Sequence, residues 1–218
     1  MTLQTLLFWD QVGHLGAAGL MLPLLLIVCA CLWQTGQRAV AGRWLLLLAA
    51  GAALVLMTKL VFMVWGMGSV ALDFTGISGH TTLATAILPV WLAWLPGRWG
   101  GRRVQWVALL IGLGIGALVG WSRIAVGAHS VSESVAGWLL GAAIATAAFH
   151  WFDQRVSPPL LARGAGLMLL LALSPIAANW LPTEQWERRI AQALSPTGVV
   201  HHRSWLRAQA GGRRVVRK

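Results

Sequence analysis

The sequence predicts an all-α protein, a polytopic membrane helical bundle with six transmembrane helices. Of its 218 residues, 57% are hydrophobic and only 11% are charged, which is too apolar for a soluble domain of this length. Six apolar runs have about the length, roughly 20 residues, that a bilayer-spanning helix needs. Tryptophan occurs 14 times and tyrosine never. Many of the tryptophans lie near the ends of these runs, where indoles favour the headgroup level.

The six runs divide the chain into one membrane domain and a tail. They cover residues 16–33, 43–65, 80–95, 104–121, 132–152 and 163–181. We therefore expect a membrane domain at 1–181 and a basic C-terminal tail at 182–218. The first run lies too deep in the chain, with too few cations before it, to be a cleaved signal peptide. Residues 3–12 are expected to lie along the interface as an amphipathic helix, with a frayed terminus as the alternative.

The formal net charge of +11 comes from loops and the tail, so we expect no nucleic-acid partner. The loops after runs one, three and five hold seven cations, namely Arg38, Arg43, Arg98, Arg102, Arg103, Arg155 and Arg163. By the positive-inside rule these loops are cytoplasmic, and the loops after runs two and four are extracytoplasmic. Six spans would place the cationic tail outside as well, which conflicts with the rule, but short loops orient spans best. We expect the tail to be solvated, partly disordered and in contact with anionic headgroups.

Polar residues gather at the ends of the runs that face the extracytoplasmic side. They are Lys59 late in the second run, Ser78, Gly79 and His80 at the start of the third, Ser122 and Arg123 at the end of the fourth, and His129 and Glu133 at the start of the fifth. Ionisable groups at the edge of a bilayer are costly, so their positions carry information. An up-down topology brings all of them to one membrane surface.

Each of these residues also has a purely structural interpretation. Lys59 could snorkel to the interface, and Ser78 could be an ordinary helix N-cap. Ser130 and Glu133 match the S-x-x-E capping box that starts a helix, and Arg123 could anchor its helix at headgroup level. These separate interpretations do not explain why two histidines, two cations, a carboxylate and two helix N-termini share one face.

Taken together, these residues predict an anion site. Helix N-termini present free N–H groups, and a glycine at the start of the third run lets an oxyanion approach the backbone. Lys59 and Arg123 add positive charge, Arg123 with a bidentate fork. His129 and Glu133 are four residues apart, so the carboxylate could orient the imidazole. His80 is a second imidazole that could protonate a leaving group.

At these residues the chain resembles the type-2 phosphatidic acid phosphatase superfamily, the lipid phosphate phosphatases related to vanadium haloperoxidases. That family carries three motifs, K-x6-R-P, P-S-G-H and S-R-x5-H-x3-D. The second appears here as Ile77-Ser78-Gly79-His80, and the third as Ser122-Arg123, five residues, His129, three residues and Glu133. The third motif is the specific one, because its spacing is matched through twelve positions, including Gly127.

The resemblance implies a reaction and a role for each residue. His129 would attack phosphorus, and Glu133 would hold and polarise the His129 imidazole. His80 would protonate the leaving oxygen. Water would then cleave the phosphohistidine. The phosphate oxygens would be bound by Lys59, Ser78, Gly79 and Arg123, and neither a metal nor another cofactor would be required.

The chain departs from the family motifs at three places. Ile77 replaces proline, and Glu133 replaces the shorter aspartate. In the first motif, Gly66 and Met67 stand where arginine and proline are expected, so one phosphate-binding cation is missing. Losing such a contact would cost on the order of 10²–10³ in rate, unless a cation from the tail or another loop replaces it.

Glycines at helical spacing predict close helix packing around the site. They are Gly112, Gly116 and Gly120 in the fourth run and Gly137 and Gly141 in the fifth. Such small-residue faces allow close helix contact, which would hold Arg123 and His129 at a fixed separation. The same glycines are also common packing devices and do not by themselves indicate catalysis.

We therefore expect an integral-membrane lipid phosphatase acting on a phosphomonoester or diphosphate of a phospholipid or polyprenyl lipid. The expected location is the inner membrane of a bacterium, with the active site on the extracytoplasmic face. The partners are the bilayer and the lipid phosphate, and the sequence does not indicate an oligomeric state. Two alternatives stay open, a lipid-to-lipid phosphotransferase and a lipid-phosphate binding or transport protein with weak or no turnover.

Overall fold

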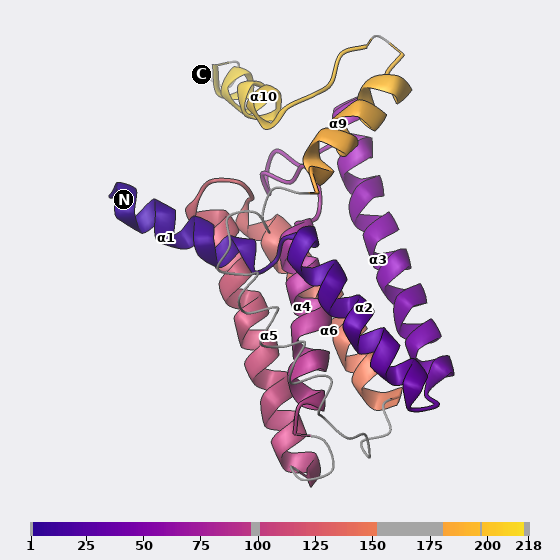
Figure 1. Ribbon diagram of the computed structural model, residues 1–218. Coiled ribbons are helices and arrows are strands. Elements are labelled where there is room, and N and C mark those ends of the chain that lie inside the picture. The colour runs from indigo at the N-terminus through magenta and orange to yellow at the C-terminus, as the bar shows by residue number, and fades with distance from the viewer. Residues whose placement is uncertain (1, 97–100, 152–180, 197, 216–218) are drawn as a thin grey trace.

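The described residues form a bundle of helices in the computed structural model (Figure 1), which describes residues 2–96, 101–151, 181–196 and 198–215. Within these ranges the regular structure is helical, apart from an isolated antiparallel bridge between Ser69 and Phe74. The all-α prediction is therefore confirmed for the described residues. The sixth predicted run lies outside them, apart from Leu181.

Five helices correspond to the first five predicted runs. They are α2 (Ala18–Gln34), α3 (Arg38–Trp65), α4 (Gly79–Trp94), α5 (Gly101–Ala125) and α6 (Val131–Trp151). Four stretches among the described residues are long and apolar enough to cross a membrane, namely Leu3–Gln34, Arg38–Trp65, Gly101–Ala125 and Val131–Trp151. With 16 residues, α4 is shorter than these. The chain is thus an apolar helical membrane protein, and the count of six spans stays a prediction.

The central helix is α4, which is held by close contacts with α5 and α6. A Cβ atom added at Gly112 or Gly116 of α5 would lie 2.3 Å from an atom of α4. One added at Gly137 or Gly141 of α6 would lie 2.7 Å from a backbone carbonyl oxygen at the start of α4. Both predicted glycine faces therefore pack on α4, because only glycine allows the helices to approach this closely.

An N-terminal helix, α1 (Leu3–His14), lies across one end of the bundle (Figure 1). The side chain of Thr2 caps it by accepting a hydrogen bond from the N–H of Thr5 at 3.3 Å. Leu3, Leu7 and Phe8 are 72%, 57% and 59% exposed, as an interfacial helix requires. Its position in the membrane interface remains a prediction.

The tail is folded at the same end of the bundle. It forms α9 (Thr183–Leu194), which packs beside the last turns of α3, and α10 (Arg203–Val215), which lies farther out at this end (Figure 1). Ala191 and Leu206 are buried, and the backbone N–H of His201 donates to the Met63 carbonyl oxygen at 2.9 Å. The expectation of a partly disordered tail is wrong for the described residues, because apolar burial and contacts with α3 order them.

Candidate active site

A tight turn between α5 and α6 holds His129 against the end of α5. The N–H groups of Ala128 and His129 both donate to the Arg123 carbonyl oxygen, at 2.9 and 3.1 Å. Gly127 has φ +74°, in the left-handed region that glycine adopts readily and that commonly ends a helix. The five-residue spacing of the third motif is thus one helix-ending turn, which fixes His129 relative to Arg123.

Glu133 is fully buried in the first turn of α6 and accepts hydrogen bonds at both carboxylate oxygens. Its Oε2 accepts from His129 Nδ1 at 2.7 Å and from the N–H of Ser130 at 3.1 Å. Its Oε1 accepts from the N–H and the hydroxyl of Thr75, each at 2.6 Å. A carboxylate has no proton to donate, so Nδ1 of His129 is the donor, and in the neutral imidazole Nε2 is then the nitrogen with the free lone pair.

The capping box and the imidazole contact occur together. Besides the bond from the N–H of Ser130 to Glu133, the N–H of Glu133 donates to the Ser130 hydroxyl at 3.4 Å. The two interpretations of Glu133 are therefore compatible, because one oxygen serves both the helix start and His129. The family motif described above has aspartate at this position. The longer side chain of Glu133 still reaches the imidazole.

The N-terminus of α4 brings the second motif to the same place. The N–H of Ser78 donates to the Glu133 carbonyl oxygen at 3.2 Å, which joins α4 to α6. The Ser78 hydroxyl is fully buried and hydrogen-bonds the Thr81 hydroxyl at 2.9 Å. Ser78 occupies the N-cap position, but its side chain makes no capping bond to a backbone N–H. It lines neither of the two cavities described next, whereas Gly79 and His80 line the first of them.

The first cavity, of about 240 Å³, has a polar end and an apolar body. The polar end is lined by Lys59, Gly79, His80 and His129, together with Glu184 and Glu187 of α9. The apolar body is lined by Leu22, Leu48, Ala52, Val55, Leu56, Leu83 and Ile144. From Lys59 to Leu48 the α3 wall runs roughly 16 Å, at about 1.5 Å per helical residue.

Arg123 lines a second cavity, of about 600 Å³, which adjoins the first at His80. That cavity also includes Asp10 and His14 of α1. The residues of the predicted anion site therefore line two adjoining cavities, with His80 on both, Arg123 on one and His129 on the other. Among the described residues, the buried Nε of Arg123 has no hydrogen-bond partner.

Comparison with known proteins identifies the family to which these motifs belong. The sequence model of the PAP2 superfamily matches residues 68–157, which contain the second and third motifs but neither Lys59 nor Gly66. An uncharacterized 22.5 kDa protein in the cps region of Klebsiella pneumoniae is 33% identical over 209 residues, covering 93% of this chain and 99% of that protein. The chain belongs to the PAP2 superfamily. No solved structure matches it. The resemblance inferred from the motifs is confirmed.

The lysine that corresponds to the first PAP2 motif is paired with a carboxylate from the tail. Lys59 Nζ lies 2.9 Å from each carboxylate oxygen of Glu187 in α9, and the two side chains are 17% and 18% exposed. Lys59 therefore does not simply snorkel to water. Glu187 was not predicted as a site residue, because nothing in the sequence links two positions so far apart in the chain.

Where the first PAP2 motif has arginine, Gly66 lies against the tail. Gly66 follows the end of α3 with φ +67°. A Cβ atom there would lie 2.6 Å from Cη2 of Trp205 and 3.2 Å from a ring carbon of His201, so any other residue would collide with the indole. The glycine that stands in place of the family arginine thus leaves space for Trp205 of α10.

Two arginines of α10 contact the site from the tail. Arg203 donates to Glu133 and, at 3.1 Å, to Asp73, while Arg207 donates to Asp73 at 2.9 Å. The hydrogen bond from Arg207, together with the nearby Arg203, holds the pKa of Asp73 below its usual range. The tail was expected to be one possible source of a replacement cation, but neither Arg203 nor its partners Asp73 and Thr75 could be singled out from the sequence.

Proposed function

We propose that this PAP2 protein is an integral-membrane lipid phosphatase that hydrolyses a phosphomonoester or diphosphate of a phospholipid or polyprenyl lipid through a phosphohistidine. One observation carries the proposal. A single cavity has Lys59, His80 and His129 at one end and apolar side chains of α2, α3, α4 and α6 along its length. Such a cavity suits a molecule with a phosphate at one end and a hydrocarbon chain at the other.

In the first step, Nε2 of His129 attacks phosphorus and a P–N bond forms. The P–O bond to the lipid breaks, and His80 gives a proton to the leaving oxygen. The buried Glu133 carboxylate, 2.7 Å from Nδ1, stabilises the positive charge that develops on the imidazole. Lys59, the backbone N–H groups at the start of α4 and Arg123 bind the phosphate oxygens.

In the second step, water attacks the phosphorus of the phosphohistidine. The P–N bond breaks, His129 regains its lone pair, and inorganic phosphate leaves when the substrate is a monoester. The unprotonated His80 accepts the proton from the attacking water, which returns the enzyme to its starting state. Because His80 lines both cavities, it can serve the leaving group and the water from one position.

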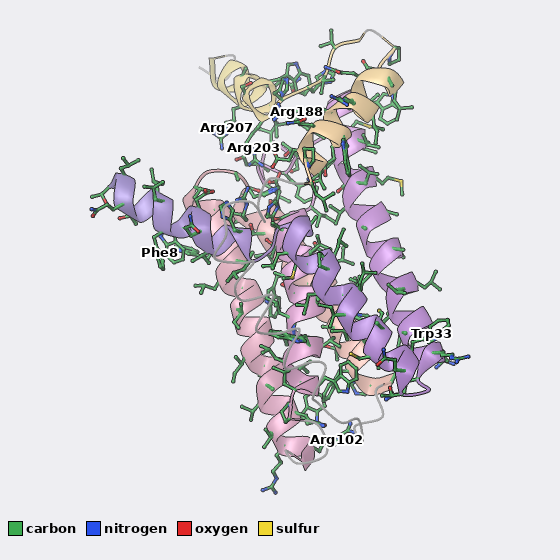
Figure 2. All side chains as sticks on the ribbon, in the orientation of Figure 1. Phe8, Trp33, Arg102, Arg188, Arg203 and Arg207 are labelled. Atoms are coloured by element: carbon green, nitrogen blue, oxygen red, sulfur yellow. The ribbon has the colours of Figure 1, made fainter. Side chains whose placement is uncertain are left out.

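The site belongs, in this proposal, on the extracytoplasmic face of a bacterial inner membrane. Arg102 lies at the opposite end of the bundle from Arg203 and Arg207 (Figure 2). Arg38 begins α3, whereas Lys59 lies near the end of that helix. Short loops rich in arginine stay in the cytoplasm, which supports an outward-facing site.

Phosphate release from a panel of lipid phosphates in detergent micelles tests this function. The parent protein is compared with His129→Asn and with the matched control His150→Asn, whose histidine lies near the other end of α6 and contacts Thr146. We expect His129→Asn to lose about 10³-fold or more, because the nucleophile is gone, and His150→Asn to keep its rate. An equal loss in both variants would contradict the assignment. Acid-labile labelled phosphate on the parent protein would identify the phosphohistidine.

A lipid-phosphate binding protein without turnover is the second candidate. The ion pair between Lys59 and Glu187 and the glycine at position 66 favour it, because both reduce the positive charge available to phosphate. In that case lipid phosphate would bind without release of phosphate, and His129→Asn would bind it equally well. Label that appears on a second lipid instead of in solution would identify a phosphotransferase.

A further inference from the structure

We propose that Arg203 is a positioning residue of this active site, so that the C-terminal helix α10 is part of the catalytic machinery. The inference rests on the proposed phosphatase function and extends it to a segment outside residues 68–157, which match the PAP2 superfamily. In this arrangement Arg203 holds Glu133, and Glu133 in turn holds His129.

The contacts of Arg203 form a bridge between a loop and the catalytic carboxylate. Its Nη2 donates to Oε2 of Glu133, the oxygen that also accepts from His129 Nδ1, and to the Thr75 hydroxyl at 3.3 Å. Its Nη1 donates to a carboxylate oxygen of Asp73 at 3.1 Å and to the Asp73 carbonyl oxygen at 3.4 Å. A planar guanidinium can make both sets of bonds at once, whereas an ammonium is a compact charge on a flexible stem.

The charges of this group explain why a cation is needed there. Glu133 is fully buried, and a buried carboxylate is unfavourable unless it is paired and hydrogen-bonded. Arg203, with its side chain 18% exposed, is its cationic partner from the tail. The pairing fixes the position of Oε2, and with it the direction in which Nε2 of His129 points.

The tail is anchored so that Arg203 reaches this position. The N–H and Nδ1 of His201 lie 2.9 and 3.2 Å from the Met63 carbonyl oxygen. The rings of His201 and Trp205 are 4.5 Å apart, and Trp205 covers Gly66. In Figure 2, Arg203 extends from α10 toward the bundle. The glycine at position 66 and the arrival of a tail arginine are thus two parts of one arrangement.

The position of Arg203 predicts a specific kinetic signature. It does not line the cavity that holds Lys59 and His129, so its loss should leave substrate binding largely intact. Glu133 would keep its bonds from Thr75, His129 and Ser130, so the fold should persist. What is lost is the orientation of the carboxylate, and partners that orient a reacting group are commonly worth about 10–100-fold in activity.

The experiment uses full-length protein in detergent micelles and a lipid phosphate that the parent hydrolyses. We expect Arg203→Ala to lower kcat about 10–100-fold with KM nearly unchanged, and added guanidinium to restore part of the rate. Arg203→Lys should recover part of the rate but not all of it, because it keeps the charge without the fork. Arg188→Ala is the matched control, since Arg188 is an exposed arginine of the tail helix α9 with no described bond to Glu133 or Asp73, and it should keep its rate.

Several outcomes would overturn the inference. They are an Arg203→Ala protein as active as the parent, an equal loss in Arg188→Ala, or a loss confined to KM. If Arg203→Ala does not fold, Trp205→Ala provides the second test, because it releases α10 without changing Glu133, and an unchanged kcat there would count against the inference. A parent that releases no phosphate from any lipid would instead contradict the proposed function itself.

Discussion

Two parts of the molecule surround the cavities, and they are held together in different ways. In the core of α4, α5 and α6, helices approach so closely that glycine replaces larger side chains at the contacts, as where Gly112 lies over the backbone of Pro89. The cover formed by α9 and α10 instead adds polar links to its apolar contacts. They are the ion pairs of Lys59 with Glu187 and of Asp73 with Arg207, and the contact of Arg203 with the buried Glu133.

This difference separates the tasks of the two parts. The core carries the backbone of His80, His129 and Glu133, which cannot shift without moving a helix. The cover adds charges to the same site, through partly exposed pairs that are individually weak and through Arg203, which contacts the buried Glu133. The backbone that carries the proposed reacting groups is therefore rigid, while substitutions in the tail can change the orientation of Glu133 and the charge around the proposed phosphate position.

The largest effect should come from breaking the core at a glycine contact. A Cβ atom at Gly112 would lie 2.3 Å from Cα of Pro89 and 2.7 Å from its nitrogen, so Gly112→Ala would force α4 and α5 apart. We expect a loss of about 1–3 kcal/mol in stability, as for other overpacked sites, measured by thermal unfolding in detergent. Gly114→Ala is the control, because nothing lies within 4 Å of its added Cβ. Equal stability of the two variants would contradict the close packing.

A smaller effect should follow from releasing the cover at Lys59. Glu187→Gln removes the carboxylate that now neutralises this lysine, which leaves its ammonium free for phosphate. Because the pair is partly exposed, we expect KM for a lipid phosphate to fall about two- to fivefold, with little change in kcat. Glu184→Gln is the comparison, since Glu184 lines the same cavity but has no described bond to Lys59. An increase in KM would mean that Glu187 positions Lys59 instead of competing for it.

The smallest effect should be the pH dependence of tail docking. The hydrogen bond from Arg207 and the charge of Arg203 lower the pKa of Asp73 in the folded protein. A group with a lowered pKa stabilises the docked state above its usual value of about 4, and this contribution is lost as the pH falls through the lowered value. We expect faster hydrogen exchange in α10 at acidic pH, after correction for the intrinsic rate. Asp73→Asn should remove this pH dependence while leaving the tail less protected throughout.

The third motif could be predicted from the sequence because its geometry is local. His129 and Glu133 are one helical turn apart, and the turn at Gly127 returns the chain onto the carbonyl oxygen of Arg123. Short spacings of this kind leave few backbone conformations open, so a match through twelve positions predicted both the family and the contact. The positions of helices α2 to α6 followed from apolar runs for the same reason.

Other features of the site depend on how distant segments pack. Arg123 and His129 were expected to form one anion site, and the structure places them on two adjoining cavities to which α9 contributes, with α1 on the Arg123 side. Capping and orienting were alternative interpretations of Glu133, and the structure combines them. The glycine faces were recognised, but the sequence did not indicate that both would pack on α4.

Local patterns in the chain were sufficient to predict the family, the helical membrane architecture and the spacing of the second and third motifs. They were sufficient because hydrophobic burial in a bilayer and the geometry of a helix-ending turn act on neighbouring residues. Tertiary packing was needed to bring Arg203 to Glu133 and Glu187 to Lys59. Those pairs join residues far apart in the chain, whose meeting depends on the shape of the whole bundle and on the space that Gly66 leaves for Trp205.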